Sequence, residues 1–362
     1  MNFNPTQRFE QLDQLLVQYW SAWQPTFGHS DKHWLDQASL QTIYRELAPA
    51  TTLPRSPASI KKSEPPAGMK LRKWQQIEQF KARFSSNASS VVDWCCGIGH
   101  LSRHLASSEQ SVVGLEIDPA LVAKAMTHQA KSAIFHQCDV LADPERYLHP
   151  GQSFVALHAC GSLHTAMVEA TVKTRGSDLH LAPCCYHKRF HQGLKMLSRP
   201  ARRSELKLTE RNIQLAVRQS VTAANRELQA REQLRLYRLG FDEWVKRELK
   251  VTHYTPLPSV SSAIINKGFA AFCQWGASQR VPQLANKEVT AEAKLLNSAK
   301  SRLEREVAYE AQCELFRRAL EIRLCLDNVM FLEENGFRAE LIEFCSPTIT
   351  PRNILIQAYR MD

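Results

Sequence analysis

Short apolar segments alternate with helical patterns through the middle of the chain. Five apolar segments of strand length are Val91–Cys95, Val112–Ile117, Ala133–Gln137, Phe154–His158 and Leu179–Ala182. Helices are expected between them, for example over His100–Ser107 and in the segment that Pro119 opens, because proline is tolerated in the first turn of a helix. This alternation predicts an α/β fold with a doubly wound sheet.

Two further apolar segments near the C-terminus, Ala339–Phe344 and Asn353–Ala358, raise the expected number of strands to seven. They follow a long helical pattern over about 299–335, which Gly336 ends. Another amphipathic helix is predicted over 70–84, before the first strand. A strand pair after a series of strand–helix units is typical of an α/β sheet that closes with antiparallel strands.

The chain is expected to divide into four segments. Residues 1–68 are predicted to be an N-terminal helical segment and a linker rich in proline, serine and lysine. Residues 69–186 would form the first part of the sheet domain. Residues 187–298 would form a basic helical insertion after the fifth strand, and residues 299–362 would add the helix and strand pair that complete the domain.

The positive charge of the chain is concentrated in one region. The 362 residues carry a formal net charge of +10. Residues 187–250 alone hold 16 Lys and Arg against 7 Asp and Glu. Two interpretations stay open: the solvated face of helices that pack elsewhere, or an arm that binds a phosphate backbone.

The composition excludes several classes of protein. Hydrophobic residues make up 44% and charged residues 23%, as in folded globular proteins. The sequence has no uncharged apolar run of about 18 residues, so no membrane span is expected. Met1–Trp20 has no apolar core of a signal peptide. Four of the ten cysteines form adjacent pairs, so we expect reduced thiols and a cytoplasmic location.

A glycine-containing turn follows the first predicted strand, in the string Val91–His100. Gly97 and Gly99 allow a tight turn and the close approach of a ligand to the backbone. The dinucleotide fingerprint G-x-G-x-x-G fails at its third glycine, where Ser102 stands. Asp93 at the strand end would repel a pyrophosphate and attract a cationic ligand, which favours S-adenosylmethionine over NAD.

Acidic residues follow three successive strands. Asp93 ends the first strand, Glu116 ends the second and Asp139 follows the third. Glu116 has the separation from the turn expected of a carboxylate that binds ribose hydroxyls. Asp139 is placed to accept a hydrogen bond from an adenine amino group. Since the carboxyl ends of such strands meet at one edge of the sheet, the three acids are predicted to line one crevice.

These residues resemble the class I S-adenosylmethionine-dependent methyltransferases, whose turn usually reads acid-x-Gly-x-Gly-x-Gly. Here Cys95 stands at the first glycine. The resemblance implies a Rossmann-like methyltransferase sheet and an S-adenosylmethionine site. The cofactor-binding residues that it implies are Asp93, Cys95, Gly97, Gly99, Glu116, Ile117, Asp139, Val140 and His158.

Two other strings narrow the resemblance. Leu157–Leu163 (LHACGSL) follows the fourth strand and Pro183–Lys188 (PCCYHK) follows the fifth, and Pro351–Asn353 is similar as well. They look like a methyltransferase subfamily that includes the eukaryotic glutathione S-transferase C-terminal domain-containing protein and the tRNA acceptor-stem 2′-O-methyltransferase. The latter carries zinc-binding modules near its N-terminus, for which residues 1–90 show no comparable spacing of Cys and His.

Cysteines and histidines are predicted to gather at the ends of the first, fourth and fifth strands, which are neighbours in this kind of sheet. Three interpretations stay open: a packed wall of small thiols, a catalytic set of His158, Cys160, Tyr186 and His187, or a structural zinc site, which the adjacent cysteines disfavour. We expect His158 to be the base, Tyr186 to line the substrate slot and no metal to be bound.

The expected function is methyl transfer to RNA, most plausibly to structured RNA such as tRNA. The residues expected to bind phosphates are Lys188, Arg189, Arg202, Arg203 and Lys207. A protein methyltransferase and a binding module without catalysis remain as alternatives. The sequence leaves the methylated atom and the oligomeric state open.

Overall fold

The computed structural model describes residues 4–24, 27, 33–55, 63–127, 132–190, 194–217 and 225–361, with the backbone alone at 189–190 and 225–227. The contacts within the chain form two compact units. The first contains residues 1–19, 42–218 and 316–362, and the second contains residues 20–41 and 219–315. The boundaries of these two units differ from those of the four segments predicted from the sequence.

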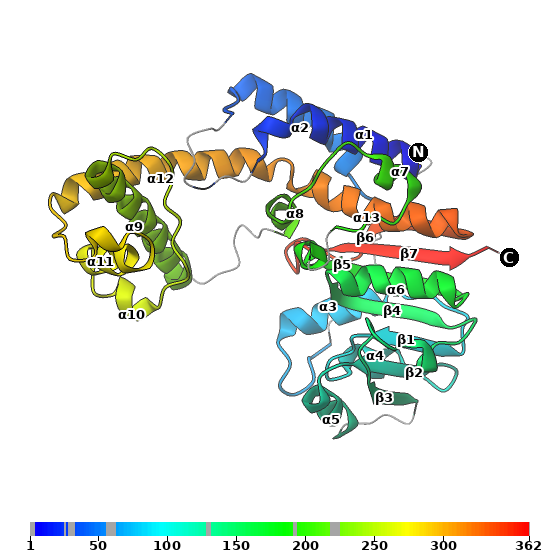
Figure 1. The fold of residues 1–362 in the computed structure, drawn as a ribbon. Coiled ribbons are helices and arrows are strands. Elements are labelled where there is room, and N and C mark those ends of the chain that lie inside the picture. The colour runs from blue at the N-terminus through cyan, green and yellow to red at the C-terminus, as the bar shows by residue number, and fades with distance from the viewer. Residues whose placement is uncertain are drawn as a thin grey trace. The chain divides into compact units, whose positions relative to one another are not determined.

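A seven-stranded sheet forms the centre of the first unit (Figure 1). Its order is β3-β2-β1-β4-β5-β7-β6, in which β7 is antiparallel to both of its neighbours. The strands are β1 (Ser90–Trp94), β2 (Ser111–Glu116), β3 (Ala133–Gln137), β4 (Ser153–Cys160), β5 (Asp178–Cys184), β6 (Phe337–Glu343) and β7 (Ile354–Arg360). The doubly wound, seven-stranded α/β sheet predicted from the apolar segments is confirmed.

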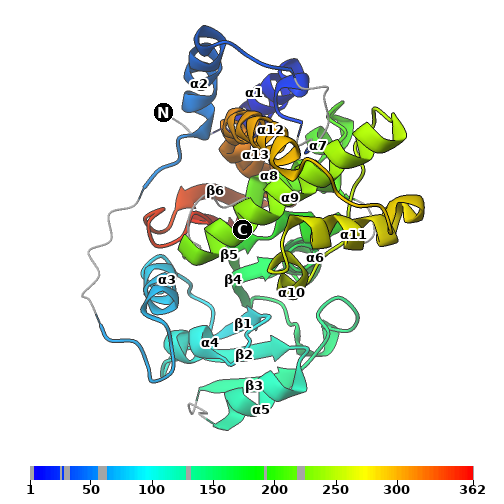
Figure 2. The ribbon, with the colours of Figure 1, turned by 90° about the vertical axis from the view of Figure 1, so that its left-hand side faces the viewer.

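Helices cover both faces of this sheet (Figures 1 and 2). On one face lie α3 (Leu71–Lys81), α4 (His100–Leu105) and α5 (Pro119–Thr127), and on the other lie α6 (Ser162–Lys173) and α13 (Arg317–Glu334). Because both faces are covered, β5 is buried at every position. On the first face, Trp74, Phe80 and Leu101 pack with β1, β4 and the β6–β7 pair.

Other short elements of the first unit pack along α13. They are α1 (Pro5–Gln18), α7 (Arg199–Arg203) and α8 (Glu210–Val217). Asp13 of α1 forms a salt bridge with Arg323, whose side chain is buried, and also accepts from Ser204 at 2.8 Å. This unit also contains the 3₁₀ turns η2 (Glu145–Tyr147) and η3 (Tyr186–Phe190). The helix α2 (Gln37–Thr51) is divided between the two units, and its residues from 42 onward belong to the first.

The second unit is helical and has its own core. It contains η1 (Trp20–Ala22), α9 (Asn225–Leu249), α10 (Ser262–Ile265), α11 (Phe269–Arg280), η4 (Pro282–Leu284) and α12 (Glu292–Glu314). Its buried cluster includes Phe241, Trp244 and Phe272.

Basic residues of α9 make contacts inside this unit. Arg235 pairs with Glu310 at 2.9 Å, and Arg238 donates to the carbonyls of Leu257 and Pro258, each at 2.6 Å. Lys246 pairs with Asp242 at 2.9 Å. These contacts support the interpretation of α9 as a packed helix with a charged face, because its cations already have partners.

The helix predicted over 299–335 is two helices. α12 ends at Glu314 and α13 begins at Arg317, with Leu315 and the buried Phe316 between them. No glycine or proline marks the break, and the apolar pattern runs through it, so the sequence pattern could not separate the two. The contacts assign α12 to the second unit and α13 to the first. None of the helices that the structure describes has the length and apolar composition needed to cross a bilayer.

The Asp327 carboxylate is fully buried in α13 and anchors the segment before α7. It accepts from the backbone N–H groups of Leu197 (3.0 Å) and Ser198 (2.8 Å) and from the Ser198 hydroxyl (3.0 Å). We predict that Asp327→Ala lowers the free energy of unfolding by about 3 kcal/mol, because it leaves buried donors unpaired. Urea denaturation measures this.

The control is Glu334→Ala, which removes an exposed carboxylate that accepts from the N–H of Arg199. It should cost less than about 1 kcal/mol. Equal losses in both variants would contradict the anchoring role of Asp327.

Candidate active site at the carboxyl ends of the strands

The backbone takes an unusual conformation where three central strands end. Cys95 after β1, His158 near the end of β4 and Cys185 after β5 have φ values of 62°, 71° and 48°. Non-glycine residues rarely adopt positive φ, and such residues concentrate at functional sites. Cys95, which stands where the methyltransferase turn usually has glycine, thus has a positive φ, which glycine adopts without strain.

The two glycines of the turn have different surroundings, although both have positive φ. A Cβ on Gly97 (φ 60°) would meet no atom within 4 Å, so its backbone faces open space. A Cβ on Gly99 (φ 73°) would stand 2.3 Å from the ring of Phe135. Gly97 is therefore the position where a ligand can approach the backbone, and Gly99 is needed for packing against β3.

Glu116 joins the end of β2 to the glycine turn. Its Oε2 accepts from the N–H of Gly97 at 3.0 Å, and its Oε1 accepts from the N–H of Asp118 at 3.1 Å. The next residue, Ile117, is 58% exposed although it is large and apolar. An exposed aliphatic side chain beside a fixed carboxylate suits a flat ring with a polar sugar attached.

Asp93 is buried beneath the turn, with 2% of its surface exposed. Its Oδ2 accepts from the Ser102 hydroxyl at 2.6 Å. Burial raises the pKa of Asp93 to about 7, against the opposing effect of the Ser102 hydrogen bond, and the nearby Glu116 carboxylate raises it further. A cation in the crevice would favour the ionised form.

The Cys95 thiol lies among the three predicted acids. Burial raises its pKa most, and the charges of Glu116, Asp93, Cys160 and Asp139 raise it further. Asp139 itself is exposed, and its Oδ1 accepts from the N–H of Leu141 at 2.9 Å. The neighbouring Val140 is buried. The shared influence on one thiol supports the prediction that the acids line a common crevice.

His158 lies at the same edge, where the pairing of β4 with β5 shifts between Leu157 and Ala159. Its Nε2 is hydrogen-bonded to Oε1 of Gln76 from α3. With Oε1 as the acceptor, Nε2 carries the proton and Nδ1 keeps a lone pair. Burial lowers the pKa of His158 to about 4, and Arg352, Lys73 and Arg72 lower it further. The imidazole is therefore neutral near pH 7.

Three thiols meet beside His158. The Sγ atoms of Cys160, Cys184 and Cys185 all lie within 4.8 Å of one another, and those of Cys160 and Cys184 are 3.2 Å apart. Hydrogen bonds from Cys160 and Cys184 lower the pKa of Cys185, and the cations Arg352 and Lys188 lower it further. The predicted gathering of cysteines from the fourth and fifth strands is present here.

The other two residues predicted to be catalytic, Tyr186 and His187, follow Cys185 in η3. Tyr186, expected to line the substrate slot, is fully buried, and its hydroxyl lies 3.2 Å from the Cys325 sulfur in α13. The turn at Cys185 directs the tyrosine inward to the helix layer. His187 is half-buried, and its Nδ1 has no hydrogen-bond partner among the described residues.

Basic side chains lie near His158 and Cys185, and we call Arg72, Lys73, Lys188 and Arg352 the basic rim. Arg72 donates to the carbonyl of Ile349 at 2.5 Å. Arg352 lies 3.8 Å from the Cys185 sulfur and 3.4 Å from the carbonyl oxygen of Val217. Arg72, Lys73 and Lys188 are exposed. These four charges come from α3, η3 and the segment before β7.

The other residues predicted to bind phosphates are not part of this rim. Arg202 and Arg203 are exposed in α7, whose preceding residues are held by Asp327 and Glu334 toward the C-terminal end of α13. Phe337, just after α13, pairs with Arg360 at the end of β7, and the adjacent Tyr359 pairs with Asp178 at the start of β5, so this is the opposite end of the sheet. Lys207 is exposed beyond α7, and the side chain of Arg189 lies outside the described residues.

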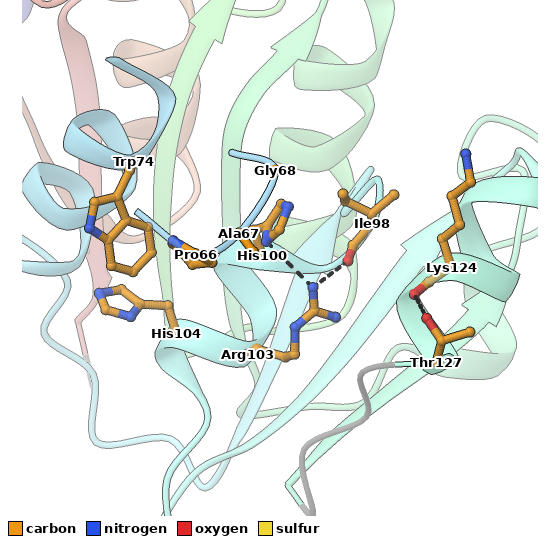
Figure 3. A pocket seen from close by; sticks show the side chains of 10 residues that line it. All are labelled: Pro66, Ala67, Gly68, Trp74, Ile98, His100, Arg103, His104, Lys124 and Thr127. Atoms are coloured by element: carbon orange, nitrogen blue, oxygen red, sulfur yellow. Dashed lines mark hydrogen bonds between the residues drawn. The ribbon is translucent and has the colours of Figure 1, made fainter. Parts of the chain in front are cut away.

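A separate cavity of about 620 Å³ adjoins the glycine turn (Figure 3). Its lining is formed by Pro66, Ala67, Gly68, Trp74, Ile98, His100, Arg103, His104, Lys124 and Thr127. Asp93, Glu116 and Asp139 are not among them. Arg103 crosses it, donating to the carbonyl of Ile98 at 2.7 Å. The charged and titratable side chains of its lining are Arg103, Lys124, His100 and His104.

Residues 72–191 match the model of a protein family described as a methyltransferase domain. The match spans β1 to β5 and thus the acidic crevice, His158 and the three thiols. It supports the predicted enzyme class, a methyltransferase, over this third of the chain.

Among curated proteins, the chain is similar to the glutathione S-transferase C-terminal domain-containing protein of Bos taurus. The two are 29% identical over 140 residues, which cover 37% of this chain and 22% of the relative. The chain therefore matches about a fifth of the length of that protein.

Solved structures with a similar arrangement include a putative methyltransferase of Haloferax volcanii in complex with the Trm112 activator. It has a TM-score of 0.27 and 18% identity, and the match covers 33% of this chain and 58% of that one. Another is the magnesium protoporphyrin IX methyltransferase of Synechocystis, with a TM-score of 0.26 and 17% identity over 31% and 55% of the two chains. Similarity at this level does not bear on substrates.

Several residues of the site were not predicted from the sequence. Gln76, which orients His158, and the rim residues Arg72 and Lys73 come from the helix before the first strand, outside any motif. Arg352 belongs to the Pro351–Asn353 string, which was noted as part of the resemblance without a role. Ser102 was noted only as the residue that breaks the dinucleotide fingerprint.

The two glycines should respond differently to alanine. Gly99→Ala should destabilise the chain by about 3 kcal/mol, because the new Cβ overlaps Phe135. Gly97→Ala meets no atom and should cost about 1–2 kcal/mol from backbone strain alone, while weakening cofactor binding. Thermal denaturation and calorimetric titration measure the two effects.

The double variant Gly99→Ala with Phe135→Leu is the control for the first effect. It should recover part of the stability that Gly99→Ala loses, beyond the sum of the single changes. Strict additivity would show that the ring of Phe135 is not the obstacle.

The buried Asp93 predicts a dependence of stability on pH. The pKa of Asp93 in the folded chain, about 7, exceeds its ordinary value of 3.8. The stabilising contribution of the protonated group is therefore complete below about pH 4 and is lost as the pH rises to 7. Without cofactor, Asp93→Asn should be more stable than the native chain at pH 8, by about 2–4 kcal/mol, and by less at pH 5.

Urea denaturation at the two pH values measures this difference. The conservative variant Asp93→Glu keeps an ionisable group and serves as the control. An Asn variant less stable than the native chain at pH 8 would show that the carboxylate is stabilised as an ion.

Proposed function

We propose that this protein is an S-adenosylmethionine-dependent methyltransferase that acts on RNA, most plausibly on a structured RNA such as tRNA. The observation that carries the proposal is the division of charge along one edge of the sheet. Carboxylates lie at the ends of β1, β2 and β3, and the cations of the basic rim lie around the ends of β4 and β5. A cationic cofactor fits the first half and a polyanionic substrate fits the second.

The residues of the acidic half have roles that suit the cofactor. Glu116 is fixed by two backbone N–H groups and would hold ribose hydroxyls, and the exposed Ile117 would cover one face of the adenine. Asp139 would accept from the adenine amino group. Asp93 supports the turn through Ser102, and the open space at Gly97 leaves the backbone accessible.

The rim suits phosphate groups for two reasons. Arg72 and Lys73 lie in the first turn of α3, which has no acidic residue there. Cations at the N-terminal, positive end of a helix dipole destabilise the helix when no anion is present. A bound anion removes this repulsion, so the helix end and the two cations favour its binding together. Arg352 adds a planar fork that matches phosphate oxygens. The exposed Arg202, Arg203 and Lys207 lie farther away and would contact a longer RNA.

The chemistry required of the protein is modest. The sulfonium of S-adenosylmethionine supplies an activated methyl group, so the chain must align a nucleophile and accept its proton. The neutral His158 offers Nδ1 as an acceptor, and Gln76 fixes the ring through Nε2. A pKa of about 4 makes His158 a weak base. Its role is therefore to orient a hydroxyl and take its proton late in the transfer.

The motif strings support the finer assignment. LHACGSL after β4 and PCCYHK after β5 resemble the subfamily that includes the tRNA acceptor-stem 2′-O-methyltransferase. The curated relative of Bos taurus belongs to the same named group. All ten cysteines are free thiols, which suits a reducing compartment such as the cytoplasm.

The proposal is tested with methyl-labelled S-adenosylmethionine and total RNA from cells that lack the gene. We expect label in RNA with the native chain and at least a hundredfold less with His158→Ala. Arg352→Gln and Lys73→Gln should raise KM for RNA about tenfold each and reduce the salt dependence of binding. Cofactor affinity should stay unchanged in these two variants.

The matched control is Lys173→Gln. It removes an exposed lysine at the end of α6 that pairs with Glu145. It should leave the KM unchanged. Label that appears in protein and survives nuclease treatment would instead establish a protein methyltransferase. Cofactor binding without transfer to either substrate would contradict catalysis on both.

A further inference from the structure

The three thiols at the ends of β4 and β5 have no role in the proposed methyl transfer. Cys160 is the last residue of β4 and pairs in register with Cys184, the last residue of β5. Cys185 follows directly. The three sulfurs form the metal-ligand grouping found among the described residues.

We propose that Cys160, Cys184 and Cys185 bind one zinc ion through their three sulfurs. The distances suit this ion: Zn–S bonds of about 2.3 Å in a tetrahedron separate the sulfurs by about 3.8 Å. The observed spacing brackets that value, since the closest pair is 3.2 Å apart and all lie within 4.8 Å. Small movements of the side chains would reach the tetrahedral geometry.

The backbone explains how two adjacent cysteines contribute to one site. In a regular strand, the side chains of consecutive residues point to opposite faces. Cys185 has φ 48°, so the alternation ends at Cys184 and both sulfurs reach the sulfur of Cys160. Such a conformation costs about 1–3 kcal/mol and persists where the surroundings require it. The adjacency that disfavoured zinc in the sequence is thereby resolved.

The hydrogen bonding and charge of the site also suit a metal. The thiols of Cys160 and Cys184 both direct their hydrogen bonds to the carbonyl of His158, at 3.5 and 3.3 Å. On zinc binding the three thiols lose their protons. Three thiolates and Zn²⁺ carry a net charge of −1, which the Arg352 guanidinium, 3.8 Å from Cys185, balances.

The fourth position of the tetrahedron would be taken by water. Cys184 is buried, whereas Cys160 and Cys185 are partly exposed, so solvent reaches the cluster from their side. The ion would join the ends of β4 and β5 and the residue between β5 and η3, and so fix the position of His158. This inference does not depend on the proposed function, because a scaffold without catalysis would bind zinc equally.

The full chain is purified under reducing conditions, incubated with Zn²⁺ and passed over a weak chelating resin. The zinc that it retains is then measured. We expect about one zinc per chain by mass spectrometry. Cys185→Ser and Cys184→Ser should keep less than about a tenth of it. Cys345→Ser, which changes a buried cysteine outside the cluster, should keep all of it. Removal of zinc by chelation should lower the melting temperature of the native chain.

A second measurement does not depend on the folding of the variants. Titration of the native chain with Cd²⁺ should give near-ultraviolet thiolate-to-metal absorption that saturates at one equivalent. Cys345→Ser should behave in the same way. No thiolate absorption, no retained zinc, or a Cys160–Cys184 disulfide in the reduced, metal-exposed chain would overturn the proposal. Equal zinc retention in the native chain and a folded Cys185→Ser variant would do the same.

Discussion

The parallel strands β1 to β5 all end at the same edge, and the chain must turn away from each of them there. Positive φ occurs at three residues that are not glycine: Cys95 and Cys185 just after β1 and β5, and His158 where the pairing of β4 with β5 shifts. These conformations interrupt the regular alternation of side chains at this edge. The covered sheet fixes the strand positions and thereby stabilises these unfavourable conformations.

Charge along this edge follows the order of the strands. The acids belong to the outer three strands on one side, and the cations of the basic rim belong to α3, η3 and the segment before β7. The direction of β7 contributes to this separation of charge. Because β7 runs antiparallel to β5, the residues before β7, including Arg352, lie beside the end of β5 and Cys185. The segment before β7 therefore contributes to the proposed site, although it lies outside the matched methyltransferase segment.

Much of this architecture was predictable from the sequence. The seven strands follow from apolar segments bounded by turn residues, and so does the position of Asp93, Glu116 and Asp139 at or just after the ends of three neighbouring strands. The break between α12 and α13 was not predictable, because no residue near Leu315 opposes a continuous helix. Gln76 and the rim cations were missed for another reason: their role depends on tertiary neighbours that no local spacing encodes. The inward position of Tyr186 likewise depends on one backbone angle at Cys185.

Arg352 also connects parts of the first unit that are far apart in sequence. Its guanidinium is shared between the Cys185 sulfur and the carbonyl of Val217, the last residue of α8. α8 is the final element of the first unit before the chain continues to the second. The same guanidinium that lies beside Cys185 therefore also caps the last carbonyl of α8, so the position of this positive charge depends on the end of that helix.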